Sequence, residues 1–315
     1  MNEFISSIEA ADTIAVTGHI HPDGDCIGSC LGLRQYILDN YPGKSVTVYL
    51  ESIAPEFLFL SGADSVKQET ESKSYDLFFV LDCSSLDRIE PYLSMYERAA
   101  KTFCIDHHHI SSKGIGQEYI LKPQASATCE VLYELFETDR ISLSCAYCLY
   151  TGIVHDTGVF KHSNTTKQTM EYAGDLISKG INTSKVIDET FYQKTFVQNR
   201  VMGQALVNSR LYEDGQIILS YLNKDEMQAL GADSGDTNGI IDQMRVTKGV
   251  EAAVFLYALD KDTYKVSMRS NGRVNVAAIS EEFSGGGHVR AAGFSMKAGL
   301  EEVTGIVLSK IREQL

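Results

Sequence analysis

The stretch Thr13–Asp25, TIAVTGHIHPDGD, joins an apolar run to a turn crowded with polar side chains. Residues 13–17 are typical of a buried strand, because they form a short apolar and β-branched run bounded by turn residues. Pro22 and Gly24 then predict a sharp turn, and residues 28–38 continue with helical spacing. A strand that leads through a turn into a helix is the unit of parallel α/β sheets, whose ligands bind beyond the carboxyl ends of the strands.

The same alternation predicts the architecture of the whole chain. In the first half, strands are expected at 13–17, 46–50, 76–81 and 102–105, with helical spacing at 28–38, 93–100, 127–136 and 144–154. In the second half, strands are expected at 216–222, 251–259, 264–269 and 293–296, with helices near 224–230, 239–244, 274–283 and 301–313. We therefore expect an α/β protein. We expect residues 1–184 to form a doubly wound, mostly parallel sheet, residues 185–204 a helical linker, and residues 205–315 a smaller mixed α+β domain. We also expect an active-site cleft between the two domains.

Composition narrows the function classes. At roughly 150 residues per domain, 315 residues predict about two domains. The net charge of −14 argues against binding of bulk duplex nucleic acid by charge alone. No apolar run approaches the ~20 residues of a membrane span, and no signal peptide is visible. Seven scattered cysteines, an odd number, do not form a disulfide framework, so a cytoplasmic protein is expected.

Polar side chains with metal-ligand chemistry end four apolar runs. They are His19, Asp23 and Asp25 after residues 13–17; Asp82 after 76–81; Asp106, His107 and His108 after 102–105; and His155 and Asp156 after 150–154. A parallel sheet would gather such side chains at one edge. Imidazole and carboxylate together suit a divalent ion such as manganese, and the set is large enough for two ions that share a bridging carboxylate.

Paired ions of this kind indicate phosphate chemistry. Two ions about 3.5–4 Å apart lower the pKa of a bridging water and stabilise the attacking and leaving oxygens on phosphorus. The sequence therefore predicts hydrolysis of a phosphate ester by in-line attack. The competing interpretation is that each residue is a turn or capping residue, and it is the one we adopt for His21 and His109.

The cysteines have a simpler interpretation. Cys145-x-x-Cys148 stands alone in a helical run, without the second pair that a zinc site would need. Cys26 and Cys30 lie four residues apart on the predicted helix after Asp25. We interpret all four as core contacts.

A glycine run in the second half, SGGGHVRAAG at residues 284–293, is the other notable motif. Its three glycines would let backbone N–H groups approach an anion, and His288 adds a donor. Arg269 ends a predicted strand and could bind a phosphate through two N–H groups. A tight turn is the alternative for the glycines, and a solvated surface arginine is the alternative for Arg269 and Arg273.

Together these motifs resemble the DHH phosphoesterase superfamily from about residue 10 to residue 300. The name-giving triplet is Asp106–His107–His108, the first motif is His19-x3-Asp23-x-Asp25, the second is Asp82, and the fourth is Asp156 within HDTGVF. The GGGH run resembles the C-terminal domain that accompanies one subfamily. The short two-domain layout looks like the nanoRNase and 3′-phosphoadenosine 5′-phosphate (pAp) phosphatase group, whose members depend on manganese.

The resemblance implies roles for individual residues. It implies that His19 and Asp23 bind one ion, that Asp25, His107 and Asp156 bind the other, and that Asp82 bridges the two. His108 would lie near the scissile phosphate, and Asp106 would support the site. The nucleotide would be held by Arg269, Ser270, Gly286, Gly287 and His288. Neither the resemblance nor the spacing assigns roles to His155 and His162.

The expected enzyme is thus a phosphoric ester hydrolase with two Mn²⁺ or other divalent ions per chain. Its expected substrates are short single-stranded oligonucleotides, including linear dinucleotides such as pApA, and pAp. The resemblance also suggests a homodimer, which no pattern in the residues supports. The alternatives are a cyclic-dinucleotide phosphodiesterase, an inorganic pyrophosphatase or exopolyphosphatase with the same metal site, and a non-catalytic nucleotide sensor. The GGGH run argues against the pyrophosphatase.

Overall fold

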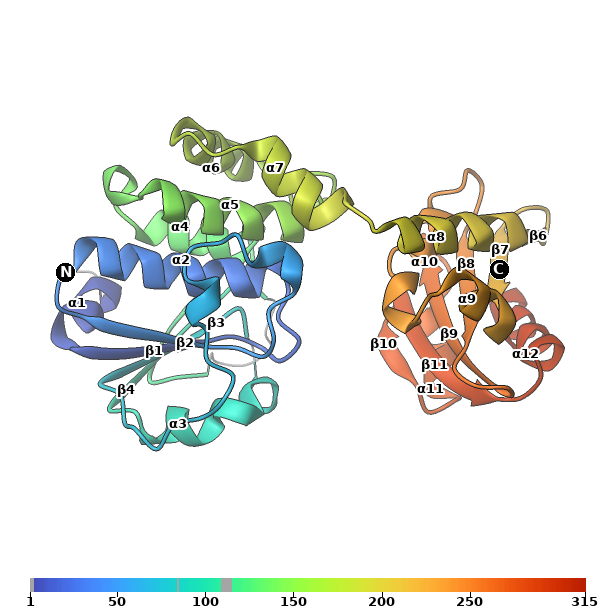
Figure 1. The fold of residues 1–315 in the computed structure, drawn as a ribbon, viewed down its shortest axis with the longest axis horizontal. Coiled ribbons are helices and arrows are strands. Elements are labelled where there is room, and N and C mark those ends of the chain that lie inside the picture. The colour runs from blue at the N-terminus through green and yellow to red at the C-terminus, as the bar shows by residue number, and fades with distance from the viewer. Residues whose placement is uncertain (1–2, 84, 109–114) are drawn as a thin grey trace. The chain divides into compact units, whose positions relative to one another are not determined.

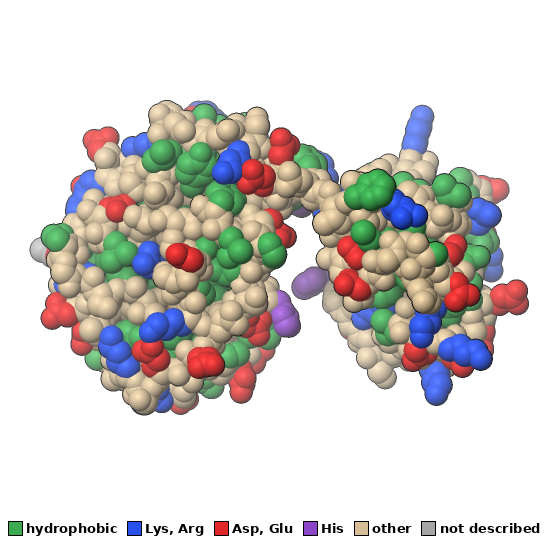
Figure 2. Space-filling model, in the orientation of Figure 1, with side chains coloured by type: hydrophobic (Ala, Val, Ile, Leu, Met, Phe, Trp, Pro, Cys, Tyr) green, Lys and Arg blue, Asp and Glu red, His purple; other side chains and the backbone are tan. Residues whose placement is uncertain are grey.

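A computed structural model describes residues 3–83, 85–108 and 115–315 of the chain, so His109 lies outside the described residues. The chain forms two compact units, Met1–Gln193 and Lys194–Leu315, each with its own sheet (Figure 1). Within the described residues, no helix is long and apolar enough to cross a membrane. On the visible face of each unit, acidic and basic side chains are interspersed (Figure 2).

The first unit is built on a parallel sheet with the strand order β2-β1-β3-β4-β5. The strands are β1 (Thr13–Thr17), β2 (Ser45–Tyr49), β3 (Leu77–Leu81), β4 (Lys101–Asp106) and β5 (Glu118–Leu121). The order reverses direction between β1 and β3. This reversal is the switch point at which doubly wound sheets bind their ligands, at the carboxyl ends of the strands.

Helices cover both faces of this sheet (Figure 1). They are α1 (Glu3–Ala10), α2 (Gly24–Asn40), α3 (Leu93–Arg98), α4 (Thr128–Leu135) and α5 (Leu143–Asp156). Two further helices, α6 (Lys167–Ser178) and α7 (Thr183–Ile187), pack against α5. Strand β3 is buried along its whole length and divides its side chains between the two sides. Phe79 packs into the core beneath α2, α4 and α5, whereas Phe78 packs into the core around α3. A strand with two buried faces needs a continuous apolar sequence, which LFFVL supplies.

The second unit holds a mixed sheet with the order β10-β11-β9-β8-β7-β6. Its strands are β6 (Arg210–Tyr212), β7 (Ile217–Leu222), β8 (Ala252–Ala258), β9 (Thr263–Ser270), β10 (Gly286–His288) and β11 (Ala291–Lys297). Its helices are α8 (Phe196–Asn208), α9 (Lys224–Leu230), α10 (Ile240–Arg245), α11 (Val276–Glu281) and α12 (Leu300–Arg312). One core lies toward α11 and α12, and the other toward α8, α9 and α10. The expected fold class, a parallel α/β sheet followed by a mixed α+β region, is confirmed.

The glycine run differs from expectation. We expected an anion-binding loop at 284–293, but Gly286–His288 is a short edge strand, β10, paired antiparallel with β11. Gly287 has a φ of 143° and lies so close to Ala292 that a side chain would overlap the partner strand. The glycines therefore permit close strand pairing, and an edge strand still leaves backbone groups open on its outer side.

Candidate metal centre

The turn after β1 places His19 and Asp23 together. His19 is buried, and its Nδ1 donates to the carbonyl of Ile20 at 2.8 Å, which leaves Nε2 facing the carboxylates. Asp23 caps α2, because its Oδ1 accepts from the amides of Asp25 and Cys26 at 3.0 and 3.1 Å. Its second oxygen lies 3.8 Å from His19 Nε2. The helix start thus holds the Asp23 carboxylate by one oxygen and leaves the other for a ligand.

Asp25 connects two helices beneath the site. It is fully buried in the first turn of α2, and its two oxygens accept from the amides of Thr128 and Cys129 at 2.6 and 3.0 Å. These amides begin α4, whose preceding residue Ala127 offers no capping side chain. Asp25 therefore caps α4 from a distance of about 100 residues along the chain. Its Oδ2 also lies 3.9 Å from His107 Nε2.

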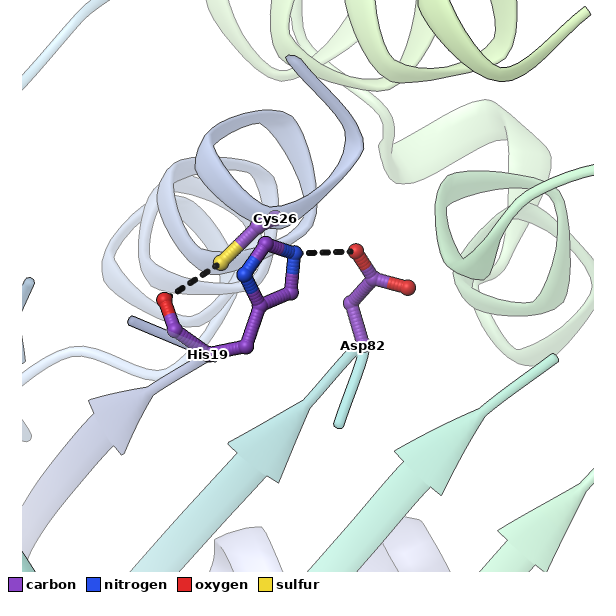
Figure 3. Close-up of side chains that lie close together, drawn as sticks. All are labelled: His19, Cys26 and Asp82. Carbon is purple, nitrogen blue, oxygen red and sulfur yellow. Dashed lines mark hydrogen bonds and ion pairs between the residues drawn. The ribbon is translucent and has the colours of Figure 1, made fainter. Parts of the chain in front are cut away.

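Asp82 lies at the middle of the cluster. Its Oδ2 is 3.4 Å from His19 Nε2, and its Oδ1 is 3.5 Å from His107 Nε2 (Figure 3 shows the His19 side). Oδ1 also accepts from the Thr128 hydroxyl at 3.1 Å. Asp82 has a φ of 54°, an uncommon backbone conformation for a residue other than glycine. Strain of this kind persists where the surrounding structure fixes it, often at functional sites, and here it accompanies a carboxylate between two imidazoles.

His107 and Asp156 form the opposite side of the cluster. His107 Nε2 lies 3.0 Å from Asp156 Oδ2, and the ring's other nitrogen faces the carbonyl of Ala125 at 3.3 Å. Asp156 ends α5, and the chain then continues through Gly158, Val159 and Phe160 with φ values of 55°, 59° and 61°. This left-handed turn ends the helix abruptly and leaves Asp156 at its tip.

His108 is held by Asp106. Asp106 is fully buried, and its Oδ1 accepts from the backbone amide and from Nδ1 of His108, at 3.1 and 2.6 Å. His108 Nδ1 also lies 3.6 Å from Asp82 Oδ1. The Asp106 hydrogen bond raises the pKa of His108 and outweighs the opposing effect of burial. Asp106 therefore orients the ring and favours its protonated form.

The site crowds carboxylates in a buried volume. Burial, followed by repulsion from Asp82, raises the pKa of both Asp23 and Asp25. Burial also opposes ionisation of Asp82, but the neighbouring imidazoles outweigh it and lower its pKa. For His107, burial is outweighed by the hydrogen bond to Asp156 together with the charges of the surrounding carboxylates, and the pKa rises to about 10. A bound divalent ion would favour the ionised carboxylates and the neutral imidazoles of this site.

The donor set fits divalent ions. Among the residues that the structure describes, three groups have ligand atoms within 4.8 Å of one another: His19 with Cys26 and Asp82, Asp82 with His107 and His108, and Asp25 with His107 and Asp156. Asp82 belongs to two of the groups and therefore lies where a bridging ligand would. Nitrogen and carboxylate oxygen donors with an excess of negative charge suit Mn²⁺ and similar ions.

Cys26 fits a core position better than a ligand position. Its thiol donates to the carbonyl of His19 at 3.9 Å (Figure 3). Burial, with the neighbouring Cys30 thiol, raises the pKa of Cys26 well above its usual value. A buried thiol of this kind behaves as a small apolar side chain of the core. All seven cysteines are buried and unpaired, which confirms the core interpretation of Cys145, Cys148, Cys26 and Cys30.

In the second unit, the structure brings some predicted substrate residues together. Ala291 pairs with Arg269 on one side and with His288 on the other, so these three residues lie side by side across β9, β11 and β10. Residues paired across a sheet share a face, and small Ala291 leaves space between the two basic side chains. Arg269 Nε donates to Asp242 at 3.1 Å.

Ser270 is not part of this group. It follows Arg269 on β9, so its side chain points to the other face, where it is buried. Its hydroxyl donates to Glu251 Oε1 at 3.2 Å, and the same carboxylate oxygen accepts from the amides of Arg273 and Val274 at 2.5 and 3.2 Å. Ser270 and Glu251 thus hold the turn after β9.

Sequence reasoning missed Thr128 and Gly24. Thr128 donates to Asp82, and Gly24 packs against His155. A threonine at the predicted start of a helix is a detectable signal for Thr128. For Gly24, the sequence pattern indicates only a turn and gives no signal of its contact with His155.

A surface cavity of about 630 Å³ opens beside the Asp23 turn. His21 and Pro22 line it together with Glu51 and Tyr92. The exposed His21 has a φ of 55°, and its backbone amide donates to Glu51 at 2.6 Å, which agrees with its interpretation as a turn residue. The volume lies within the range of small-molecule sites.

Comparison with known proteins agrees with the geometry. The model of the N-terminal domain of the DHH family matches residues 13–153, and the DHHA1 domain matches residues 214–315. A Bacillus subtilis (strain 168) protein named bifunctional oligoribonuclease and PAP phosphatase NrnA is 30% identical, over 93% of this chain and 92% of the relative. The chain therefore belongs to the DHH family, and it is a phosphoric ester hydrolase of a kind that depends on divalent metal ions.

Two further similarities extend over nearly the whole chain. The cyclic-di-AMP phosphodiesterase PdeA of Listeria monocytogenes serotype 1/2a (strain 10403S) is 27% identical over 92% of this chain, which spans 46% of that relative. A crystal structure of an exopolyphosphatase-related protein from Bacteroides fragilis superposes with a TM-score of 0.88 at 26% identity, covering 99% of this chain and 95% of that one.

Proposed function

We propose that this chain is a manganese-dependent, two-metal phosphoesterase. It hydrolyses short oligoribonucleotides, including linear dinucleotides such as pApA, to mononucleotides, and pAp to AMP. The observation that carries the proposal is the convergence of three histidines and four aspartates from four stretches of the chain, with Asp82 at the centre. The similarity to the oligoribonuclease and PAP phosphatase of Bacillus subtilis over nearly all of both chains supports the choice of substrates.

In this proposal, the carboxylates divide between two ions. One ion would be held by His19 and Asp23, and the other by Asp25, His107 and Asp156. Asp82 would be shared between them. The ions would polarise the phosphate and make a water nucleophilic. Asp106 orients His108 and favours its protonated form, in which the ring can donate a hydrogen bond to the phosphate oxygens as negative charge develops.

We further propose that the second unit binds the nucleotide. Arg269 and His288 would donate to a phosphate of the substrate, and the edge strand Gly286–Gly287 would offer backbone N–H groups. This division corresponds to catalytic chemistry in residues 1–184, a linker at 185–204 and substrate binding in 205–315.

A substrate panel under one set of metal conditions tests the proposal. It contains pAp, pApA, cyclic di-AMP, a longer RNA and pyrophosphate, each with Mn²⁺ and with EDTA. We expect turnover of pApA and pAp that requires Mn²⁺. Absence of mononucleotide release from pApA would refute the proposal, and binding without turnover would identify a nucleotide sensor.

Cyclic di-AMP hydrolysis is the second candidate. The 27% identity to PdeA over 92% of this chain favours it. The panel separates the two, because a cyclic-dinucleotide phosphodiesterase turns over cyclic di-AMP faster than pApA. Faster hydrolysis of pyrophosphate than of either would instead indicate a pyrophosphatase.

A further inference from the structure

His155 precedes Asp156 in the last turn of α5 and has no role in the chemistry proposed above. Its Nε2 lies 2.8 Å from the hydroxyl of Thr190. That hydroxyl donates its single proton to the carbonyl of Val186 at 2.8 Å, so it must accept from Nε2. The hydrogen bond therefore fixes the His155 ring as the tautomer with its proton on Nε2.

The ring is enclosed on several sides. Phe57 and Phe191 present edge contacts, with ring centroids 5.0 and 5.7 Å from that of His155. Burial lowers the pKa of His155 to about 4, which is consistent with an uncharged ring between two aromatic side chains. The contacts of the ring are thus two aromatic edges and one hydrogen bond.

The ring also contacts the backbone of the metal-binding turn. A methyl group at Gly24 would overlap three atoms of the His155 side chain, so the ring packs directly against the backbone between Asp23 and Asp25. A glycine is required there for close approach, whereas the turn itself imposes no positive φ at Gly24.

We propose that His155 is a positioning residue. It lies between the Gly24 backbone and the one-turn π-helix Asp188–Tyr192, and so fixes the Asp23 and Asp25 carboxylates relative to its neighbour Asp156. The inference rests on the proposed function, because it takes these carboxylates as ligands. Thr190 lies three residues before Gln193, where the first unit ends, so the same hydrogen bond connects the metal centre to the segment by which the chain leaves that unit.

A purely structural role is the competing explanation, and a matched pair of variants separates the two. Thr190→Val keeps the size of the side chain and removes the acceptor for His155. Thr151→Val is the control, because the buried Thr151 hydroxyl also donates to a carbonyl four residues earlier, at 2.8 Å, and that hydrogen bond involves no candidate ligand. Both variants lose one such hydrogen bond, and only the first releases His155.

The experiment measures Mn²⁺ binding to the full chain by calorimetry, together with thermal unfolding in EDTA. We expect the dissociation constant to rise about tenfold in Thr190→Val and His155→Phe, as when other groups that orient metal ligands are removed. Thr151→Val should bind Mn²⁺ like the native chain while losing similar thermal stability. His155→Gln, which can place an amide donor near the position of Nε2, should recover most of the affinity.

A second pair approaches the contact from the other side. Gly24→Ala forces the ring away from the turn, and Gly174→Ala in α6 is the control, since a methyl group there meets nothing within 4 Å. We expect weaker Mn²⁺ binding only for Gly24→Ala. Native affinity in Thr190→Val, His155→Phe and Gly24→Ala would overturn the inference. If the native chain itself bound no Mn²⁺, the proposed function would fail instead.

Discussion

At the scale of single residues, the site depends on side chains that each make several contacts. Asp82 faces His19, His107 and His108 and accepts from Thr128. It follows β3, beside the reversal of strand order between β1 and β3, and its φ of 54° is uncommon for a residue other than glycine. Substitution of Asp82 should therefore reduce activity more than it reduces the stability of the fold.

Asp82→Asn should therefore lower kcat/KM by about 100-fold or more, at the upper end of effects seen when metal sites are altered. Asp76→Asn is the matched control. Asp76 flanks the opposite end of β3, where it accepts from the amide and hydroxyl of Thr13, each at 2.8 Å. Initial rates on pApA with saturating Mn²⁺ provide the measurement. Equal losses in both variants would show that Asp82 acts through the fold.

Glu251 gives a prediction for pH at the same scale. Burial opposes its ionisation, but the amides of Arg273 and Val274 and the Ser270 hydroxyl outweigh burial and lower its pKa below the usual value of 4.5. A lowered pKa in the folded state means that the charged form stabilises the fold. This contribution is complete above the unfolded pKa, near 4.5, and is lost as the pH falls through the folded pKa.

Glu251→Gln should accordingly lower the free energy of unfolding by about 1.5–3 kcal/mol at pH 7, as for hydrogen bonds to a charged group. The difference from the native chain should shrink as the pH falls below 4.5. Urea unfolding at pH 7 and pH 4 measures it, with the exposed Glu281→Gln as control. A difference that is independent of pH would contradict the assignment.

At the scale of elements, three neighbouring strands present the basic residues of the second unit. Arg269 on β9 and His288 on β10 flank Ala291 on β11. Arg269→Ala should raise KM for pApA by about 10- to 150-fold, the equivalent of losing a charge-assisted hydrogen bond. Lys265→Ala is the control, since Lys265 lies four residues earlier on the same face of β9.

Mn²⁺ affinity should be native in both variants. A loss of Mn²⁺ binding in Arg269→Ala would contradict the division of labour between the two units. Equal increases of KM in Arg269→Ala and Lys265→Ala would show that only the general positive charge of this face contributes.

The elements also show what a sequence can predict. Strands β1 and β3 were predictable because an apolar run buried on both faces has few alternative structures, and the polar residues after them marked the site. Strand β5 was not predicted, since it lies at the sheet edge and its residues are only partly buried. Contacts such as Asp25 with α4 join residues 103 and 104 positions apart, which no local pattern encodes.

At the scale of the whole molecule, the chain contains two units with separate hydrophobic cores. The candidate ligands all belong to the first unit, so ions that bind the native state should stabilise that unit alone. Calorimetry of the full chain should show one unfolding transition that moves upward with Mn²⁺ and one that does not. At 100 times the dissociation constant, the gain is about 2.7 kcal/mol.

EDTA should reverse this shift and abolish hydrolysis, and Mg²⁺ with Ca²⁺ serve as comparison ions. If both transitions moved together, the two units would unfold cooperatively. If neither transition moved, the three histidines and four aspartates of the site, Asp82 included, would not form a metal-binding site.

The carboxylate of Asp25 carries a consequence for how such a chain can diverge. Its oxygens start α4 and also face His107, so architecture and chemistry share the same two atoms. A descendant that abandons hydrolysis and survives as a sensor can discard Asp156, whose side chain ends a helix, long before it can discard Asp25. Among descendants that have lost hydrolytic activity, we therefore expect Asp25 to be retained for its structural role at the start of α4.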